Sequence, residues 1–345
     1  MTEPRFTKMT AAHVDRLREL VGAEFVHVDS DALQAYSHDE TEDLSFPPEC
    51  VVKPASAEEV AAILTYASSE RIAVTPRGGG TGLSGGCLPL HGGIALSLER
   101  MNHIVEIDAD NLVCVTQPGV IVQTLQETVE EAGLFYPVDP ASRGSCLIGG
   151  NIAENSGGPR AVKYGVTKDF VLGLTAVLAS GEIIKTGGKL YKDVTGYNLT
   201  QTIVGSEGTL AVVTEIILKL LPLPKARTLL MIPFPDLDSA ARTVAQIKRS
   251  GAQPSALEFM ERDAIRAAAD HLNKTVEYAD AAAQLLIEID GDDQERIDAQ
   301  AEQIGELALA NDALDVLLAE GRARQDELWT IRRSMGEAVK HRSIY

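Results

Sequence analysis

A glycine-rich run, Pro76 to Gly86, constrains this chain more than any other segment. It reads PRGGGTGLSGG, and six of its eleven residues are glycine. Such a run cannot continue a helix or an ordinary strand, because glycine has no Cβ and reaches positive φ without steric cost. Successive backbone N–H groups can then converge on one anion, and the main chain can lie directly against a ligand. The run predicts a loop that binds an anion, and a diphosphate is the favoured one.

The flanking segments predict that this loop joins two strands. Residues 71–75 (RIAVT) alternate like a strand, and residues 93–98 (GIALSL) start another. The loop ends in Gly-Cys-Leu-Pro, so it has no Walker-type Gly-Lys-Ser/Thr ending and opens no helix as a dinucleotide fingerprint does. A flexible linker is the alternative for a glycine run taken alone.

Composition and charge disfavour several classes of partner. The 345 residues suffice for two domains. The net charge of −19 (31 Lys and Arg against 50 Asp and Glu) disfavours nucleic acids and anionic membranes. No stretch of the sequence is typical of a signal peptide or an integral membrane segment, and the four cysteines form no CxxC pair, so reduced thiols are expected. We therefore expect a cytoplasmic protein that is at most peripheral to a membrane through a partner.

Helices and strands are predicted around the glycine run. Residues 10–21 predict a helix and residues 50–53 a short strand. A second helix begins after Ser56, which is a good N-cap with Glu59 as its capping-box partner. Residues 103–119 predict two strands that turn at 110–111, followed by a helix at 123–132.

Two later segments carry similar signals. Residues 136–165 (YPVDPASRGSCLIGGNIAENSGGPRAVKYG) are too rich in Gly, Asn, Ser and Pro to pack regularly and too long for an idle turn, so they predict an ordered functional loop. In the segment 198–222, Gly205 and Gly208 bracket Ser206 and Glu207, and a β-rich run follows at 209–220.

These motifs, in this order and spacing, resemble the FAD-linked oxidoreductases of the vanillyl-alcohol oxidase superfamily. The resemblance runs from about Tyr36 to the end and is nearest to the branch that holds glycolate oxidase flavoprotein subunits, D-lactate dehydrogenases and D-2-hydroxyglutarate dehydrogenases. It implies an α+β fold: a PCMH-type FAD-binding domain of two α+β subdomains (residues 1–222), followed by a cap domain (residues 223–345) that covers the flavin ring.

The resemblance also implies which residues hold FAD. The first loop would bind the pyrophosphate through Arg77, Gly78, Gly79, Gly80, Thr81 and Gly82. The second would line the isoalloxazine and ribityl groups through Pro140, Ala141, Ser142, Ser145, Gly149, Gly150, Asn151, Ala153 and Asn155. The third would flank the adenine half through Gly205, Glu207, Gly208, Val212 and Val213. For each, a turn or capping role is the alternative. Some relatives attach FAD through a histidine where this chain has Thr81, so a non-covalent flavin is implied.

Beyond Pro222 the pattern is that of the expected cap. Strands are predicted at 228–234, 255–260, 285–290 and 314–319, and helices at 237–250 and 294–310, an order that favours a ferredoxin-like arrangement. In the last helix, Trp329-x-x-Arg332 matches a motif whose arginine presents its guanidinium to the substrate carboxylate. A guanidinium can bind a carboxylate through two N–H groups. A surface arginine is the alternative.

The resembling proteins continue for roughly another hundred residues, with an HxGDGNxH-type motif that supplies the general base and, in several, a metal site. None of the seven histidines here lies in such a motif or has zinc-site spacing. No catalytic base is therefore assigned; it is expected beyond Tyr345, and a divalent metal only with such a segment. We expect a C-terminally incomplete cap, through truncation or because a partner chain supplies the remainder.

The implied activity is FAD-dependent oxidation of a small 2-hydroxy acid (glycolate, D-lactate or D-2-hydroxyglutarate) to the 2-oxo acid, by hydride transfer to flavin N5. The expected partners are this acid and an electron acceptor or a partner oxidoreductase subunit. Two alternatives stay open: an alkylglycerone-phosphate synthase-like enzyme, and a catalytically silent flavin-binding subunit of a multi-subunit oxidoreductase. Sequence alone determines neither the acid, nor the acceptor, nor the oligomeric state.

Overall fold

The computed structural model describes residues 6–342, with side chains described as far as Lys340. The chain divides into two compact units. The first comprises the chain up to Gly157 together with Val166–Leu223, and the second comprises Gly158–Gly165 together with the chain from Pro224 onward. The sequence pattern predicts a single boundary near Pro222, whereas part of the second glycine-rich segment belongs to the second unit in this division.

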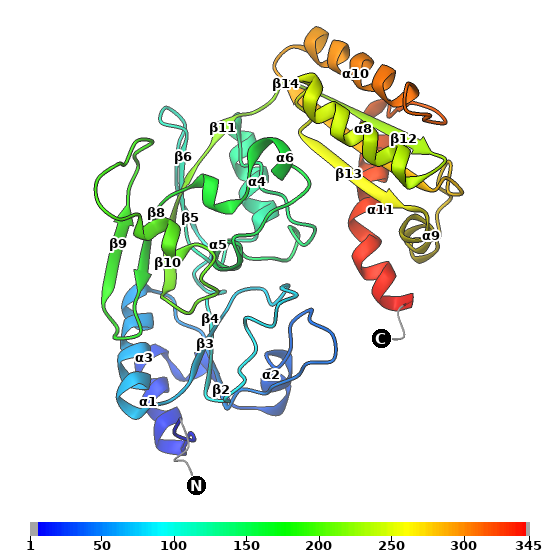
Figure 1. Cartoon of the computed structure of the whole chain (residues 1–345). Helices are drawn as coiled ribbons and strands as arrows, with labels where there is room; N and C mark the ends of the chain where they lie inside the picture. Colours follow the sequence, from blue (N-terminus) through cyan, green and yellow to red (C-terminus); the bar gives the residue numbers. More distant parts are fainter. Residues whose placement is uncertain (1–5, 343–345) are drawn as a thin grey trace. The chain divides into compact units, whose positions relative to one another are not determined.

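The first unit begins with a four-stranded sheet in the order β1-β2-β4-β3. Its strands are β1 (Val26–His27), β2 (Cys50–Val52), β3 (Val74–Arg77) and β4 (Ile94–Ser97), and helices α1 (Ala11–Val21) and α3 (Ala57–Glu70) lie beside it (Figure 1). Short elements η1 (Ala23–Phe25) and α2 (Ser30–Ala35) complete this part. Leu17, Ile63 and Ile94 are fully buried in its core. Strands β2, β4 and β3 run parallel, so the glycine-rich run leaves the sheet at the carboxyl end of β3.

Helix α3 shows how local sequence sets these boundaries. The Ser56 hydroxyl accepts a hydrogen bond from the Glu59 N–H at 3.2 Å, as predicted. The Glu59 carboxylate accepts from the N–H of Ala55 at 2.8 Å, one residue before the N-cap that a capping box would use. The helix ends where Arg71 adopts a left-handed conformation at φ 56°. Strand β3 therefore begins later than predicted, because residue 71 closes the helix.

A second sheet of the first unit has five antiparallel strands in the order β5-β6-β10-β8-β9. These are β5 (Ile104–Asp108), β6 (Val113–Thr116), β8 (Val171–Val177), β9 (Ile183–Gly187) and β10 (Val212–Lys219); α4 (Val122–Glu131), α7 (Leu199–Ile203), η2 (Thr167–Phe170) and the pair β7 (Leu134–Phe135) and β11 (Leu221–Pro222) accompany it. The second glycine-rich segment is more regular than predicted, since it contains α5 (Ile148–Glu154). Ile148 and Ile152, one helical turn apart, are fully buried and account for this helix.

The second unit has a four-stranded antiparallel sheet in the order β13-β14-β12-β15. Its elements are α6 (Ala161–Tyr164), β12 (Ala226–Phe234), α8 (Leu237–Ser250), β13 (Ala256–Glu261), α9 (Arg262–His271), β14 (Ala283–Gly291), α10 (Gln294–Leu309), β15 (Leu317–Leu318) and α11 (Gly321–Arg342) (Figure 1). The chain order and strand order are those of a ferredoxin-like fold, which confirms the prediction; helix α9 is an addition that was not predicted. Separate apolar cores lie on the two faces of the sheet, one against α9 and α11 and the other against α8 and α10.

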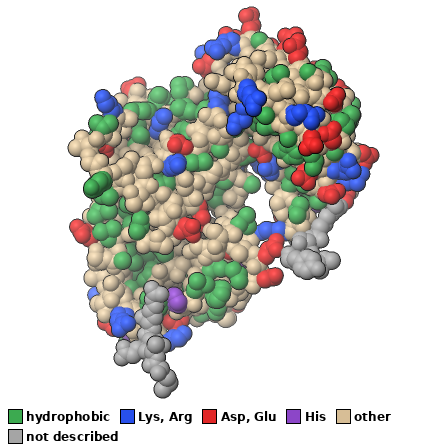
Figure 2. Space-filling view, viewed as in Figure 1, with side chains coloured by type: hydrophobic (Ala, Val, Ile, Leu, Met, Phe, Trp, Pro, Cys, Tyr) green, Lys and Arg blue, Asp and Glu red, His purple; other side chains and the backbone are tan. Residues whose placement is uncertain are grey.

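The surface carries charges of both signs. On the face drawn in Figure 2, Lys and Arg side chains lie singly or in small groups among Asp and Glu. Within residues 6–342, no helix combines the length and the apolar character that crossing a bilayer requires.

Candidate functional site

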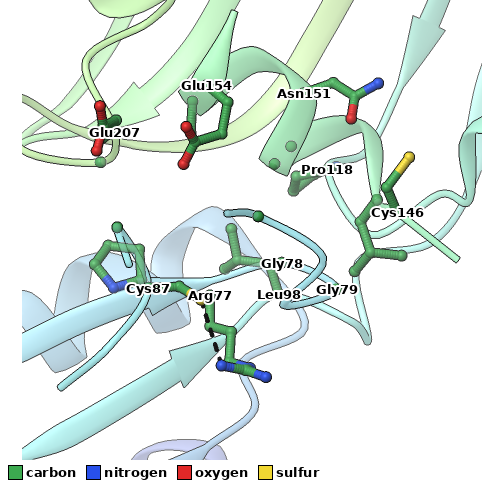
Figure 3. Close-up of a pocket in the computed structure, with 18 of the residues that line it drawn as sticks. Arg77, Gly78, Gly79, Cys87, Leu98, Pro118, Cys146, Asn151, Glu154 and Glu207 are labelled. Atoms are coloured by element: carbon green, nitrogen blue, oxygen red, sulfur yellow. Dashed lines mark hydrogen bonds between the residues drawn. The ribbon is translucent and has the colours of Figure 1, made fainter. Parts of the chain in front are cut away.

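The first unit contains a pocket to which all three glycine-rich segments contribute (Figure 3). The predicted cofactor residues that line it are Arg77, Gly78, Gly79, Gly80, Thr81, Gly82, Ser142, Gly149, Gly150, Asn151, Ala153, Glu207, Gly208, Val212 and Val213. Pro140, Ala141, Ser145, Asn155 and Gly205 are not among the lining residues. Asn155 instead caps α5, and its side-chain oxygen accepts from the N–H of Lys168 at 2.9 Å.

The first two glycine loops approach each other through their main chains. A Cβ added to Gly79 would lie 2.7 Å from the carbonyl oxygen of Ser145, and one added to Gly78 would lie 3.4 Å from the nitrogen of Gly150. Gly80 is the member of this triplet with positive φ, at +67°. Gly79 is therefore required by the close approach of the Ser145 carbonyl and not by a left-handed backbone, whereas a Cβ at position 78 would make ordinary contacts.

Helix α5 supplies the facing side of the pocket. Gly149 lies so near Pro118 that an added Cβ would meet the proline Cβ at 2.6 Å. Asn151 follows on the same helix and is 3% exposed, yet its Nδ2 has no hydrogen-bond partner among the described residues. A buried amide donor that lines a pocket without a protein partner is well suited to a polar ligand atom.

Arg77 lines the pocket but does not aim its charge at the opposite wall. In Figure 3 its side chain points away from Glu154 and Glu207. Its Nη1 donates to the sulfur of Cys87 at 3.4 Å, and its Cζ lies 5.2 Å from the centre of the Tyr36 ring. The residue is 8% exposed.

Three carboxylates also line this pocket, and sequence analysis assigned only one of them. Asp39 and Glu154 join the predicted Glu207. The pKa of Glu154 is raised, first by burial and then by the nearby charges of Glu207 and Asp39. A Cβ on Gly86 would lie 3.0 Å from Glu207 Oε2 and 3.1 Å from Glu154 Oε1, so both carboxylates meet the end of the first loop. The motif containing Glu154 was identified, but its helical register is what turns this side chain to the pocket.

The second unit holds the predicted substrate residue, Arg332, on α11. Its Nε donates to Oε2 of Glu258 on β13 at 2.5 Å, and Nη2 contacts the same oxygen. The Nε edge of the guanidinium is thus used within the unit. The Glu258 carboxylate therefore binds the Nε and Nη2 side of the Arg332 guanidinium, and Nη1 is not part of this contact.

A buried ionic cluster, which the sequence pattern did not predict, lies in the same unit. Glu288 on β14 is 2% exposed and accepts from Arg160 Nε at 3.1 Å, Trp329 Nε1 at 3.1 Å and Ser255 Oγ at 3.3 Å. Two residues on, Asp290 accepts from Tyr164 at 2.9 Å and pairs with Lys163. Glu288 and Asp290 share one face of β14, since strand side chains alternate. Trp329 of the predicted Trp-x-x-Arg motif is thus a buried structural donor.

No group of three His, Cys, Asp or Glu side chains is arranged to hold a metal within the described part of the chain. Tyr345, beyond which a base was expected, lies outside the described residues, as does the side chain of His341.

Comparison with protein families identifies both units. The model of an FAD binding domain matches residues 48–187, and that of the C-terminal domain of FAD linked oxidases matches residues 223–345. The chain belongs to the FAD-linked oxidase family. The predicted membership and the oxidoreductase class are thereby confirmed.

Curated relatives of this FAD-linked oxidase match most of the chain. A glycolate oxidase subunit GlcD from Bacillus subtilis is 44% identical over 304 residues, which are 88% of this chain and 64% of that protein. A D-lactate dehydrogenase from Anaerostipes hadrus is 37% identical and covers 99% of this chain and 72% of that protein. A D-2-hydroxyglutarate dehydrogenase from Stutzerimonas stutzeri is 32% identical, with 100% and 73% covered. The chain thus spans between 64% and 73% of the length of these relatives.

Solved structures share the fold. An alkyldihydroxyacetonephosphate synthase superposes with a TM-score of 0.79 at 20% identity, covering 98% of this chain and 65% of that one. A p-cresol methylhydroxylase with bound substrate gives 0.77 at 18% identity, with 94% and 68% covered. At these identities the likeness shows the fold alone, and it confirms the predicted fold class.

Proposed function

We propose that this chain forms the FAD-binding and cap portion of an enzyme that oxidises a small 2-hydroxy acid to the 2-oxo acid. The observation that carries the proposal is the pocket that the glycine loop at residues 78–82 lines together with Gly149, Gly150 and Asn151 of α5. Three relatives are named for glycolate, D-lactate and D-2-hydroxyglutarate, which are all 2-hydroxy acids.

The pocket residues fit a dinucleotide flavin. Gly150 lines the pocket, and a Cβ added there would have no atom within 4 Å, so a ligand can approach its main chain directly. The unpartnered Asn151 amide can donate to a polar ring atom. We assign the diphosphate to the N–H groups of residues 78–82, the ring to the side of α5, and the adenine half to the side of Glu207 and Val212. When bound, FAD supplies the hydride acceptor. Because Thr81 offers no imidazole, we propose a dissociable cofactor.

Arg332 is the proposed anchor of the substrate carboxylate. Glu258 holds the Nε edge, so the remaining Nη1 can donate to a carboxylate while the side chain keeps one orientation. Charge and planarity together favour arginine here, since a lysine would act only as a point charge. We place the general base in the part of the relatives that the matched region does not cover.

Partners and location follow from the same proposal. The electrons removed from the acid must leave through an acceptor, and we propose a partner oxidoreductase subunit or a diffusible acceptor for this role. The name of the GlcD relatives, which calls each a subunit, supports the first of these. We place the protein in the cytoplasm.

Anaerobic flavin spectroscopy tests this function. The purified chain is expected to bind FAD, to release it on acid precipitation, and to be bleached at about 450 nm, the flavin absorption band, by dithionite. When the region of a relative that this chain does not match is joined to it, one of the three hydroxy acids should also bleach the flavin. An FMN chromophore, or flavin that stays on the precipitate, contradicts the cofactor assignment. If dithionite reduces this extended protein but none of the three acids does, the catalytically silent subunit is indicated instead.

A further inference from the structure

The guanidinium of Arg77 occupies the inside of the turn at Gly80. A Cβ built on Gly80 would lie 2.1 Å from Arg77 Nη2 and 2.7 Å from Cζ. The space that a side chain at position 80 would need is therefore filled by the guanidinium of Arg77. Gly80 also has positive φ, a backbone conformation that disfavours residues with a side chain.

Two neighbours hold the guanidinium in this position. The ring of Tyr36 lies at 5.2 Å from Cζ, and Nη1 donates to the sulfur of Cys87 at 3.4 Å. Arg77 lies near the start of the glycine-rich run, Gly80 lies within it and Cys87 directly follows it, so one side chain connects the start of the run to its middle and its end. The arginine is almost fully buried, and cation–π contacts gain strength when they are desolvated.

Tyr36 is itself fixed by a polar network below the loop. Its hydroxyl donates to Glu99 at 2.6 Å, and the same carboxylate accepts from Ser97 at 3.0 Å and from Lys53 at 2.6 Å. Ser97 is the register partner of Arg77 in the parallel pair of β4 and β3. The network thus connects the sheet to the ring that supports the arginine.

We propose that Arg77 is a positioning residue for the cofactor: it shapes the glycine loop from within and presents the loop N–H groups, and it does not bind the diphosphate by its charge. This inference rests on the proposed FAD site. A flat guanidinium is suited to lie between a ring and a backbone turn, whereas the compact ammonium of lysine cannot span the same three contacts. Preorganised N–H groups spare the ligand the entropy of ordering the loop.

The test compares FAD dissociation constants and their salt dependence in purified variants. Arg77→Lys keeps the charge, and Arg77→Met removes it at similar length. Both are expected to weaken FAD binding by roughly ten- to thirtyfold, as for a desolvated cation–π contact, with the wild-type slope of log Kd against log salt. Tyr36→Leu should weaken binding while Arg77 is present, and Tyr36→Phe should retain most of the affinity. Arg16→Met, at a half-exposed position on α1, is the matched control.

Hydrogen exchange of residues 78–86 in the apoprotein gives a readout that needs no flavin. Exchange there should accelerate in both Arg77 variants, with little change in the core strands β2 and β4. Wild-type affinity in Arg77→Lys, with loss of affinity and a smaller salt slope in Arg77→Met, would show a direct charge contact and overturn the proposal. Unchanged exchange in both variants would overturn it too. A wild-type chain that binds no FAD would remove the proposed function, while the exchange measurement would still decide the role of Arg77.

Discussion

Replacement of Gly79 by alanine tests the apposition of the two glycine loops. The added Cβ would lie 2.7 Å from the carbonyl oxygen of Ser145, and the loops must separate by about 0.7 Å to reach an ordinary contact of 3.4 Å. Gly79 lacks a positive φ, so the variant does not suffer the left-handed strain that a glycine loop suggests at first sight. Overpacking of this kind costs about 1–3 kcal/mol, which corresponds to a rise in the Kd of FAD by roughly five- to 150-fold.

The assay is titration of the apoprotein with FAD, followed by quenching of flavin fluorescence. In the apoprotein the two loops can move apart, so the substitution should cost less free energy of folding than free energy of FAD binding. We therefore expect the thermal unfolding midpoint of the apoprotein to fall by about 3 °C or less. Gly188→Ala is the control, because a Cβ added there would have no atom within 4 Å and the φ of this glycine is not positive. A Gly79→Ala protein with wild-type affinity would refute the assignment of this junction to the cofactor.

Three further outcomes are expected. In a protein extended by the region of a relative that this chain does not match, Arg332→Ala should lower kcat/KM for the hydroxy acid by about a hundredfold, whereas Arg322→Ala, at a 90% exposed position of the same helix, should not; equal losses would place the carboxylate elsewhere. Glu288→Ala should reduce the free energy of unfolding by about 3–5 kcal/mol in urea titrations, because it strands a buried arginine, while exposed Glu302→Ala changes it little. Burial raises the pKa of Glu154 in the folded protein, so above the ordinary carboxyl pKa the ionisation of this side chain favours the unfolded state. Glu154→Gln should therefore raise the thermal unfolding midpoint of the apoprotein at about pH 7 and have little effect on it at about pH 4.

Local sequence patterns predict much of this fold. Ser56 and the apolar spacing that follows it predict α3, and the alternating strands and helices after Pro222 predict the ferredoxin-like unit. Glycine-rich composition marked all three segments of the pocket. These features depend on residues close together in the chain, so a short segment of sequence is enough to predict them.

Only the tertiary structure shows which residues of those segments contact one another. Only the packed loops show that Gly79 is glycine because Ser145 lies opposite it, and that Arg77 fills the turn at Gly80. Likewise, Asp39 and Glu154 reach the pocket from separate elements, and Glu288 gathers donors from positions 160, 255 and 329. Contacts between residues so far apart in the chain depend on register and helix phase, where a shift of one residue turns a side chain to the other face.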